Sequence, residues 1–395
     1  MTYFSYDKYL QNKFPLCETM MKRPIPILRN AAEKLFLSLH TTVICLIILC
    51  ILVLWGTFYQ IDHGIYAAKA RFFSSWVVLI GGLVPFPGVR LTALILILNQ
   101  IAFLLFRQKW RLEKLGLILT HAGILILLIG GGIISYTSKE TFLTLWEGET
   151  SHESSSYREW ELAGWKSGHF ESPAVFSLDS LRPGQPLGNP SFSTGILIQR
   201  IYKNCTAFMP RGHGDMMRPM GLDIDSLAAT RPAADPSENI AGMELAPRGA
   251  AAGRILLYGG NPSPTPAVLN GDSIFFSLRQ KRAPLPLSIT LIKFVKEDYA
   301  GTETARQFTS RIRAAGNGMD RDVVISMNKP FRYKQYTFYQ SSYAQDGARQ
   351  SSTLAVVENR GKALPYLAGL FMAAGLVLHF CVKLVVYIRK HRSAA

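Results

Sequence analysis

Residues 116–134 read GLILTHAGILILLIGGGII, and the rest of the chain is interpreted from this stretch. It carries one titratable side chain, His121, in an otherwise apolar run. A transmembrane helix needs roughly 20 consecutive, mostly apolar residues, so the stretch predicts a membrane span. An imidazole inside a membrane costs free energy unless something binds it. An ionisable residue at such a place therefore indicates a functional site.

Three further apolar runs have the composition of membrane spans. The chain has 395 residues, of which 48% are hydrophobic, and many of these lie in the runs. One run is short and contains the polar residues Asn99 and Gln100. It still approaches the length that a span requires. The four predicted spans are residues 41–59, 91–106, 115–136 and 364–388.

The basic residues predict the direction in which the spans run. The formal net charge is +16, and basic clusters lie in the N-terminal segment 1–40, the loop 107–114 and the tail 389–395. Because Lys and Arg accumulate on the cytoplasmic side of membrane proteins, these three segments are predicted to be cytoplasmic. The segment 137–363 then lies outside. Nucleic-acid binding is the competing explanation of a basic chain, but the clusters adjoin the ends of spans, so we expect no nucleic acid.

The segment 137–363 is predicted to form a large, mostly antiparallel β domain. Stretches such as 193–202 (STGILIQRIY) and 288–295 (SITLIKFV) alternate or are rich in β-branched residues, and Gly, Pro and Asn separate such stretches. Residues 225–270 are rich in Ala, Pro and Gly, so we expect a long loop or a flexible insertion there. The predicted fold class is a membrane protein with four transmembrane α-helices plus a large, mostly β extracytoplasmic domain.

The outer loop 60–90 is unusually apolar. It contains WVVLIGGL (76–83) and ends in PFPG (85–88). We expect a helix that lies in, or dips into, the outer membrane interface. A loop packed under the large domain is the alternative.

Two histidines fall at similar depths in the predicted membrane. His121 lies seven residues after Lys114, which is roughly 10 Å along a helix. His379, in the span 364–388, lies four residues before Lys383. Both imidazoles are therefore expected in the cytoplasmic half of the bilayer. Imidazole is a common ligand of iron, including haem iron, so both histidines are candidate haem ligands.

The helical period predicts what these histidines face. At about 100° per residue, His121 lies roughly 140° from the centre of a stripe of small residues on its own helix. His379 instead belongs to a small-residue stripe, so we expect it at a close helix contact. The two stripes are Gly116, Thr120, Gly123 and Gly130, and Ala368, Met372, Gly375 and His379. The alternative is that each histidine makes one interhelical hydrogen bond, worth about 0.6 kcal/mol.

The remaining chemistry-bearing residues form no recognisable site. The five cysteines include no CxxC and no CxxCH spacing, which argues against a thiol oxidoreductase and against covalent haem on this chain. No HxxxH or HExxH spacing is present either. We expect no metal other than haem iron, and no catalytic residue is identifiable.

Several stretches resemble the ResB family, also called CcsB, of system II cytochrome c biogenesis. They are YAAKARFFSSWVVLIGGLVPFPGVRL (66–91), LTHAGILILLIGGGI (119–133), LTLWEGETS (143–151), YTFYQSSY (336–343) and LAGLFMAAGLVLHF (367–380). The resemblance covers all four spans and both flanks of the outside domain, and it says little about residues 155–320.

The resemblance implies a multi-pass protein of the bacterial inner membrane with a large periplasmic domain. It implies a CcsA-type haem-handling partner, non-covalent transport of haem b, and apocytochrome c as the client. An intramembrane histidine of the family that handles haem matches His121, while the match does not settle His379. The haem-binding tryptophan motif belongs to the partner, so this chain is expected to be an accessory subunit of a haem lyase complex, and its status as an enzyme stays open.

Aromatic and amide side chains beside the last two spans are further candidates. Trp146, Tyr339, Gln340 and Tyr343 are candidates for contact with haem or client, and their alternative role is to pack the domain at the membrane lipid. A structural assembly protein with a β scaffold and no haem is the competing function for the whole chain. A sensor is disfavoured because no cytoplasmic domain lies beyond residues 1–40.

Overall fold

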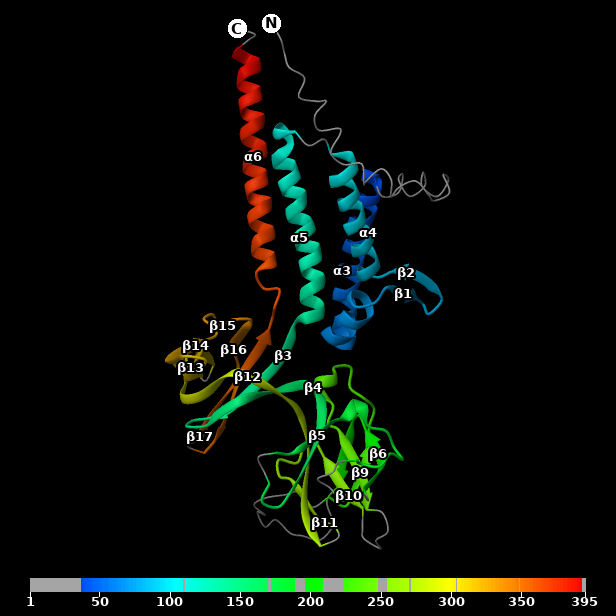
Figure 1. The fold of residues 1–395 in the computed structure, drawn as a ribbon, viewed down its shortest axis with the longest axis vertical. Helices are drawn as coiled ribbons and strands as arrows, with labels where there is room; N and C mark the ends of the chain where they lie inside the picture. The colour runs from blue at the N-terminus through cyan, green and yellow to red at the C-terminus, as the bar shows by residue number, and fades with distance from the viewer. Residues whose placement is uncertain are drawn as a thin grey trace. The chain divides into compact units, whose positions relative to one another are not determined.

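The structure is a computed structural model, which describes residues 37–108, 111–169, 172–188, 196–208, 224–247, 254–269, 271–302, 304–347 and 349–392 (Figure 1). The chain divides into two compact units. One contains residues 1–62, 68–133 and 363–395, and the other contains residues 63–67 and 134–362. The predicted cytoplasmic segment lies outside the described residues up to residue 36.

The first unit contains four helices that are long and apolar enough to cross a membrane, as the sequence predicted. They are α3 (Leu39–Ala68), α4 (Val89–Ala102), α5 (Leu115–Thr137) and α6 (Leu364–Arg392). A π-helical turn, η2 (Phe103–Arg107), continues α4. With the mostly β second unit, they confirm the predicted fold class.

The helix α3 continues well beyond the predicted end of the first span at residue 59. Its backbone breaks at Gly64, where φ is 79° and ψ is 160°, a conformation that favours glycine. The chain then turns back through η1 (Lys69–Phe73), and the Phe72 ring lies 5.3 Å from the ring of Trp55. The aromatic end of α3 is thus packed against its own continuation.

The loop 60–90 does not contain the interfacial helix that the sequence predicted over its apolar run. The run instead forms a β-hairpin of β1 (Val77–Ile80) and β2 (Val84–Pro87). The loop between the strands is Gly81, Gly82 and Leu83, and the two glycines have φ of 59° and 78°, conformations that glycine adopts readily. The apolar run is equally compatible with helix and strand, and the Gly-Gly pair decides for the hairpin.

The second unit is built around a 10-stranded antiparallel sheet of order β14-β13-β12-β4-β3-β17-β16-β15, with β11 and β5 paired beside it. Its strands are β3 (Lys139–Trp146), β4 (Thr150–Lys166), β5 (Ala174–Ser177), β11 (Thr265–Leu269), β12 (Asp272–Asp298), β13 (Ala305–Gly316), β14 (Met319–Ser326), β15 (Phe331–Tyr333), β16 (Tyr336–Asp346) and β17 (Arg349–Glu358). Smaller sheets contain β6 (Ile196–Tyr202), β9 (Gly242–Pro247) and β10 (Ile255–Tyr258), and β7 (Cys205–Phe208) with β8 (Ser226–Ala229).

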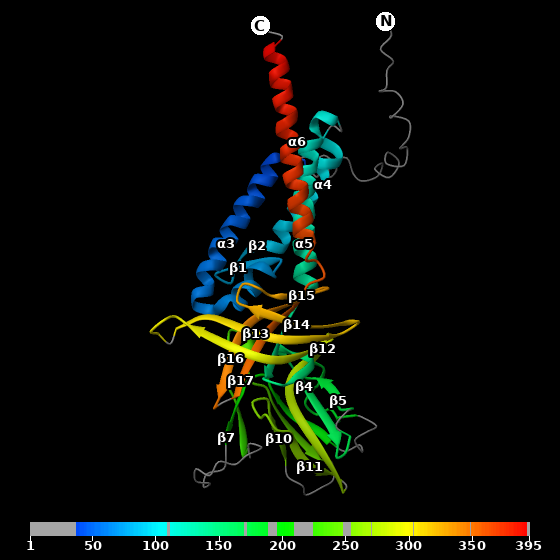
Figure 2. The same ribbon diagram turned by 90° about the vertical axis from the view of Figure 1, so that its left-hand side faces the viewer.

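The long strand β12 takes part in two separate hydrophobic cores, and Figure 2 shows its course beside β4 and β13. Its first part contributes Phe276 to a core with β6, β9 and β10. Its second part contributes Ile289 and Leu291 to a core with β3, β13, β16 and β17. Between the two parts its pairing with β4 shifts register twice, so one strand passes from one core to the next.

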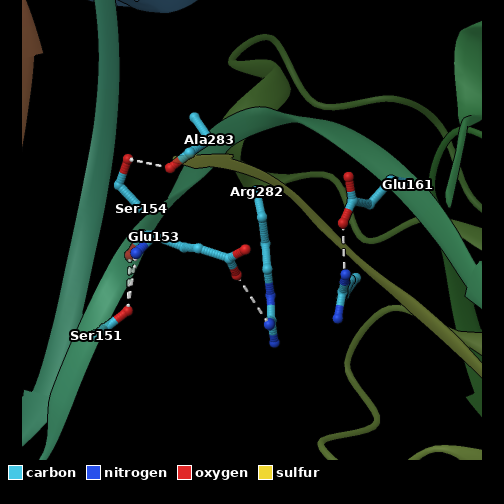
Figure 3. Close-up of polar contacts among 7 residues, drawn as sticks. Ser151, Glu153, Ser154, Glu161, Arg282 and Ala283 are labelled. Carbon is cyan, nitrogen blue, oxygen red and sulfur yellow. Dashed lines mark hydrogen bonds and ion pairs between the residues drawn. The ribbon is translucent and has the colours of Figure 1, made fainter. Parts of the chain in front are cut away.

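Ion pairs between β4 and β12 mark this passage. Arg279 Nε donates to Glu161 Oε1 at 2.8 Å, and the Glu161 side chain is only 5% exposed. Arg282 reaches Glu153 at 3.2 Å nearby, in a more exposed position (Figure 3). The buried Glu161 carboxylate therefore has a charged partner, which a buried charge requires.

Residues 225–270 differ from the predicted flexible insertion. The described part of this range contains β8, β9, β10 and β11. Met243 and Leu245 of β9 are fully buried, and Leu257 of β10 is 1% exposed. These strands are four to six residues long, which is too short for the alternation of side chains to stand out among the surrounding Ala, Pro and Gly.

Candidate functional site

The imidazole of His121 is held by its own helix. Its Nδ1 lies 2.9 Å from the carbonyl oxygen of Leu117, one turn earlier in α5. A carbonyl oxygen only accepts hydrogen bonds, so Nδ1 carries the proton when the ring is neutral. The Nε2 atom of the neutral ring then keeps its lone pair, which is the form that binds a metal.

The His121 ring packs against the end of α4. Its centroid lies 4.7 Å from that of Phe103, with 34° between the ring planes. Phe103 begins the π-helical turn η2, which ends this span at Arg107. As predicted from the helical period, His121 faces a neighbour other than the helix on which the small residues of α5 pack.

A cavity of about 260 Å³ lies beside His121, and α3, α4 and α5 all contribute to it. Gln100 is 7% exposed, and its Oε1 atom is buried without a hydrogen-bond partner among the described residues. An unpaired buried acceptor costs about 1–3 kcal/mol. The cavity is lined by Leu37, Ser38, Leu39, Thr42, Asn99, Gln100, Phe103, Arg107 and His121.

Polar contacts fix the start of α3 to α4 around this cavity. Thr42 Oγ1 donates to Asn99 Oδ1 at 2.7 Å, and Asn99 Nδ2 donates to the carbonyl oxygen of Ser38 at 3.1 Å. Arg107 donates to the carbonyl oxygen of Leu37 at 2.6 Å. The sequence alone did not assign Asn99, Gln100, Phe103 or Arg107 to the site. Two adjacent amides in an apolar run were the available signal.

His379 lies at the close contact between α5 and α6 that the sequence predicted. A Cβ on Gly116 would lie 2.5 Å from the backbone nitrogen of His379, and one on Gly123 would lie 2.8 Å from the carbonyl oxygen of Ala368. The His379 ring packs against Phe380, with 5.8 Å between centroids. His121 contacts Leu117 and Phe103, whereas His379 contacts Phe380, so these contacts do not pair the two histidines around one ligand.

In the β unit, Gln340 takes part in a polar network between three strands. Its Oε1 accepts from Ser310 Oγ at 2.6 Å, and its Nε2 donates to Ser352 Oγ at 3.1 Å. Ser310 and Ser352 are 0% and 1% exposed. Gln340 therefore links β16 to β13 and β17 inside the β unit.

Tyr343 is also turned inward, because β16 contains a bulge. The register with β17 shifts between Gln340 and Ser342, and one extra residue moves the inward face from even to odd positions. Tyr343 thus stacks on Phe294 and Phe308, at 5.3 and 5.1 Å between centroids.

Tyr339 and Trp146 remain accessible in this unit. Tyr339 is 39% exposed. Trp146 is half-buried, and the guanidinium of Arg349 lies 5.2 Å from the centroid of its ring. These two of the four predicted contact residues present aromatic surface, whereas Gln340 and Tyr343 are used inside the domain.

Residues 268–363 match the model of the ResB-like family. No curated protein is similar enough to the chain to count as a match. The matched range runs from β11 to the residue before α6 and includes YTFYQSSY, so it does not include His121. The family fits cytochrome c biogenesis in general. This match confirms, over residues 268–363, the resemblance to the ResB family that the sequence predicted.

Proposed function

We propose that this protein is a membrane subunit of cytochrome c biogenesis that handles haem through His121. In this proposal it works with a CcsA-type partner to carry haem b, without a covalent bond, across the bacterial inner membrane. The haem is then presented to the CxxCH motif of apocytochrome c. The carrying observation is the His121 ring, whose Nδ1 is engaged by Leu117 at 2.9 Å so that Nε2 is free to bind iron.

The size of the cavity supports a shared haem site. Typical ligand pockets measure about 300–1,000 Å³, and the cavity beside His121 is about 260 Å³. It has room for an edge of a large ligand next to the imidazole. We infer that the partner supplies the rest of the surface around the porphyrin. The exposed Arg107 at the cavity is a candidate partner for a carboxylate of that ligand.

The orientation follows from the charge distribution. Both termini and the loop 107–114 are placed on the cytoplasmic side, and the β unit on the periplasmic side. His121 would then receive haem from the cytoplasmic half of the membrane. Tyr339 and Trp146 are the residues through which the β unit would contact haem or client, while His379 is kept as a second candidate ligand.

The test is an optical spectrum of the detergent-purified chain, co-expressed with its CcsA-type partner. Wild type is compared with His121→Ala and with His379→Ala, which tests the second candidate ligand. We expect reduced-haem bands that weaken in His121→Ala and return when imidazole is added. His379→Ala shows whether the second histidine contributes.

Two other outcomes separate the alternatives. Haem bands that are unchanged in both variants would assign the ligands to the partner and leave this chain as an accessory scaffold. No haem in any preparation, with a stable complex, would favour the assembly protein with a β scaffold.

A further inference from the structure

The β1–β2 hairpin and the residue before it expose apolar side chains on both faces and at the tip. Both strands and the tip contribute side chains that lack cover within the described chain. They are Trp76 (49% exposed), Val77 (48%), Leu79 (50%), Leu83 (87%) and Val84 (58%). No charged residue occurs between Arg71 and Arg90. Exposed apolar surface of this kind marks a region that contacts lipid or protein.

Near its base the hairpin is anchored on a membrane-spanning helix. Val78 is 2% exposed and belongs to one cluster with Phe72 and Leu52 of α3. The neighbours of Leu52 along α3, Ile51 and Val53, are 44% and 47% exposed. In a spanning helix such side chains face acyl chains, so the surface of the hairpin continues a lipid-facing surface.

The depth of the hairpin fits the boundary of the hydrocarbon region. Trp55 and Tyr59 lie three and seven residues beyond Leu52, which is roughly 4 and 10 Å along the helix. Both belong to the same cluster. Aromatic residues of this kind gather at the membrane–water interface. The hairpin base lies at that level, because Phe86 of β2 also packs against Trp55, with 6.5 Å between the ring centroids.

The backbone of the hairpin is adapted to an environment poor in water. Val78 pairs with Phe86 and Ile80 with Val84, while Pro85 and Pro87 occupy the alternate positions of β2. A proline has no N–H, so the free edge of β2 lacks donors at both of these positions. On the other strand, the carbonyl oxygen of Leu79 accepts from Arg71 at 3.3 Å. Fewer backbone groups are thus left to demand water.

We propose that the β1–β2 hairpin is inserted into the membrane leaflet at its end of α3 and α4, with Leu79, Leu83 and Val84 in contact with lipid acyl chains. The occupant of this surface is lipid. The absence of charge, the aromatic level and the continuity with the exposed face of α3 all favour it over a soluble partner. This inference is independent of haem and of the proposed function.

The test uses a single environment-sensitive label. The native cysteines are replaced by serine, Leu83→Cys carries an NBD fluorophore, and the full chain is reconstituted in phosphatidylcholine vesicles. Ile51→Cys on α3 is the lipid-facing control, and Val268→Cys, which is 72% exposed in β11, is the water-facing control. Quenching is measured with doxyl-labelled lipids and with aqueous iodide.

At Leu83 we expect doxyl quenching comparable to that at Ile51 and iodide quenching at least about fivefold weaker than at Val268, because water is scarce at that depth. Iodide quenching equal to that at Val268 would overturn the proposal. Protection from both quenchers would also overturn it, because the hairpin would then be covered by protein. Leu83 is exposed, so the label itself leaves the packed side of the hairpin intact.

Discussion

The backbone nitrogen of His379 lies 2.5 Å from the point that a Cβ on Gly116 would occupy. The contact continues along the two helices, since a Cβ on Gly375 would lie 2.6 Å from Thr120. Small residues allow such close approach, and van der Waals packing then replaces the hydrophobic effect that is absent in lipid. The pairing of α5 with α6 therefore depends on residues without side chains.

Gly116→Ala is expected to weaken this pairing. The new methyl group meets backbone atoms that cannot rotate away, and overpacking typically costs about 1–3 kcal/mol. The measurement is the midpoint of thermal unfolding in detergent. Gly131→Ala in the same helix is the matched control, because nothing lies within 4 Å of its added Cβ. Equal midpoints for the two variants would contradict the packing.

Gln340→Ala is expected to destabilise the β unit. It leaves the buried hydroxyls of Ser310 and Ser352 bonded to each other at 2.7 Å but without their amide partner, and the net loss of a hydrogen bond costs about 0.5–1.5 kcal/mol. The decrease is measured by chemical denaturation of the full chain. Gln345→Ala on the same strand is the control, because Gln345 is exposed and its amide donates to the nearby Gly347 carbonyl oxygen at 3.2 Å. If Gln340→Ala left stability intact and weakened client binding, the contact role would stand instead.

The buried ion pair between Glu161 of β4 and Arg279 of β12 gives a third prediction. Glu161→Gln removes the charge that faces Arg279 at 2.8 Å, where both side chains are largely buried. Hydrogen bonds to charged groups contribute about 1.5–3 kcal/mol, so a loss of that order is expected at pH 7. Glu159→Gln is the control. Its partner Lys281 lies 2.6 Å away, but both are about half exposed, and exposed pairs contribute about 0–1 kcal/mol. Similar losses in both variants would show that burial does not matter here.

The spans were predictable because apolar length is a local property of sequence. The opposite faces of His121 and of the glycine stripe followed from the helical period alone. The hairpin in the loop 60–90 was missed because an apolar run has no period that separates strand from helix. The inward turn of Tyr343 was also out of reach, since it depends on a bulge whose register is set by β17. The cavity beside His121 needed α4, whose Phe103 and Gln100 come from a different span.

Cys205 gives a prediction that depends on pH. Burial raises the pKa of its thiol to about 11, whereas a free cysteine has a pKa of about 8.5. The neutral thiol is therefore favoured by folding. Its contribution to stability is complete below about pH 8.5 and is lost as the pH rises toward about 11. In a variant that retains Cys205 alone, a water-soluble maleimide should react slowly in the native protein up to pH 9 and rapidly after denaturation. Fast native labelling at pH 8 would contradict the burial of the thiol.

A substitution of Gln100, whose Oε1 is unpaired, should affect stability and haem binding in opposite directions. Gln100→Leu replaces a buried acceptor without a partner by an apolar group of similar size, and removing that cost is expected to stabilise the protein by about 1 kcal/mol. If the cavity holds part of a haem, the same change removes a polar contact beside His121 and lowers the haem recovered with the purified complex. The unfolding midpoint should therefore rise while haem absorbance falls.

The control for this variant lies one turn earlier on the same helix. Leu96 is 5% exposed, and Leu96→Met keeps its volume and apolar character. Neither the unfolding midpoint nor the haem absorbance should therefore change much. A lower midpoint for Gln100→Leu would mean that Oε1 is satisfied in the protein. A higher midpoint with undiminished haem would mean that haem is not held in this cavity. The cavity would then no longer support His121 as a haem ligand.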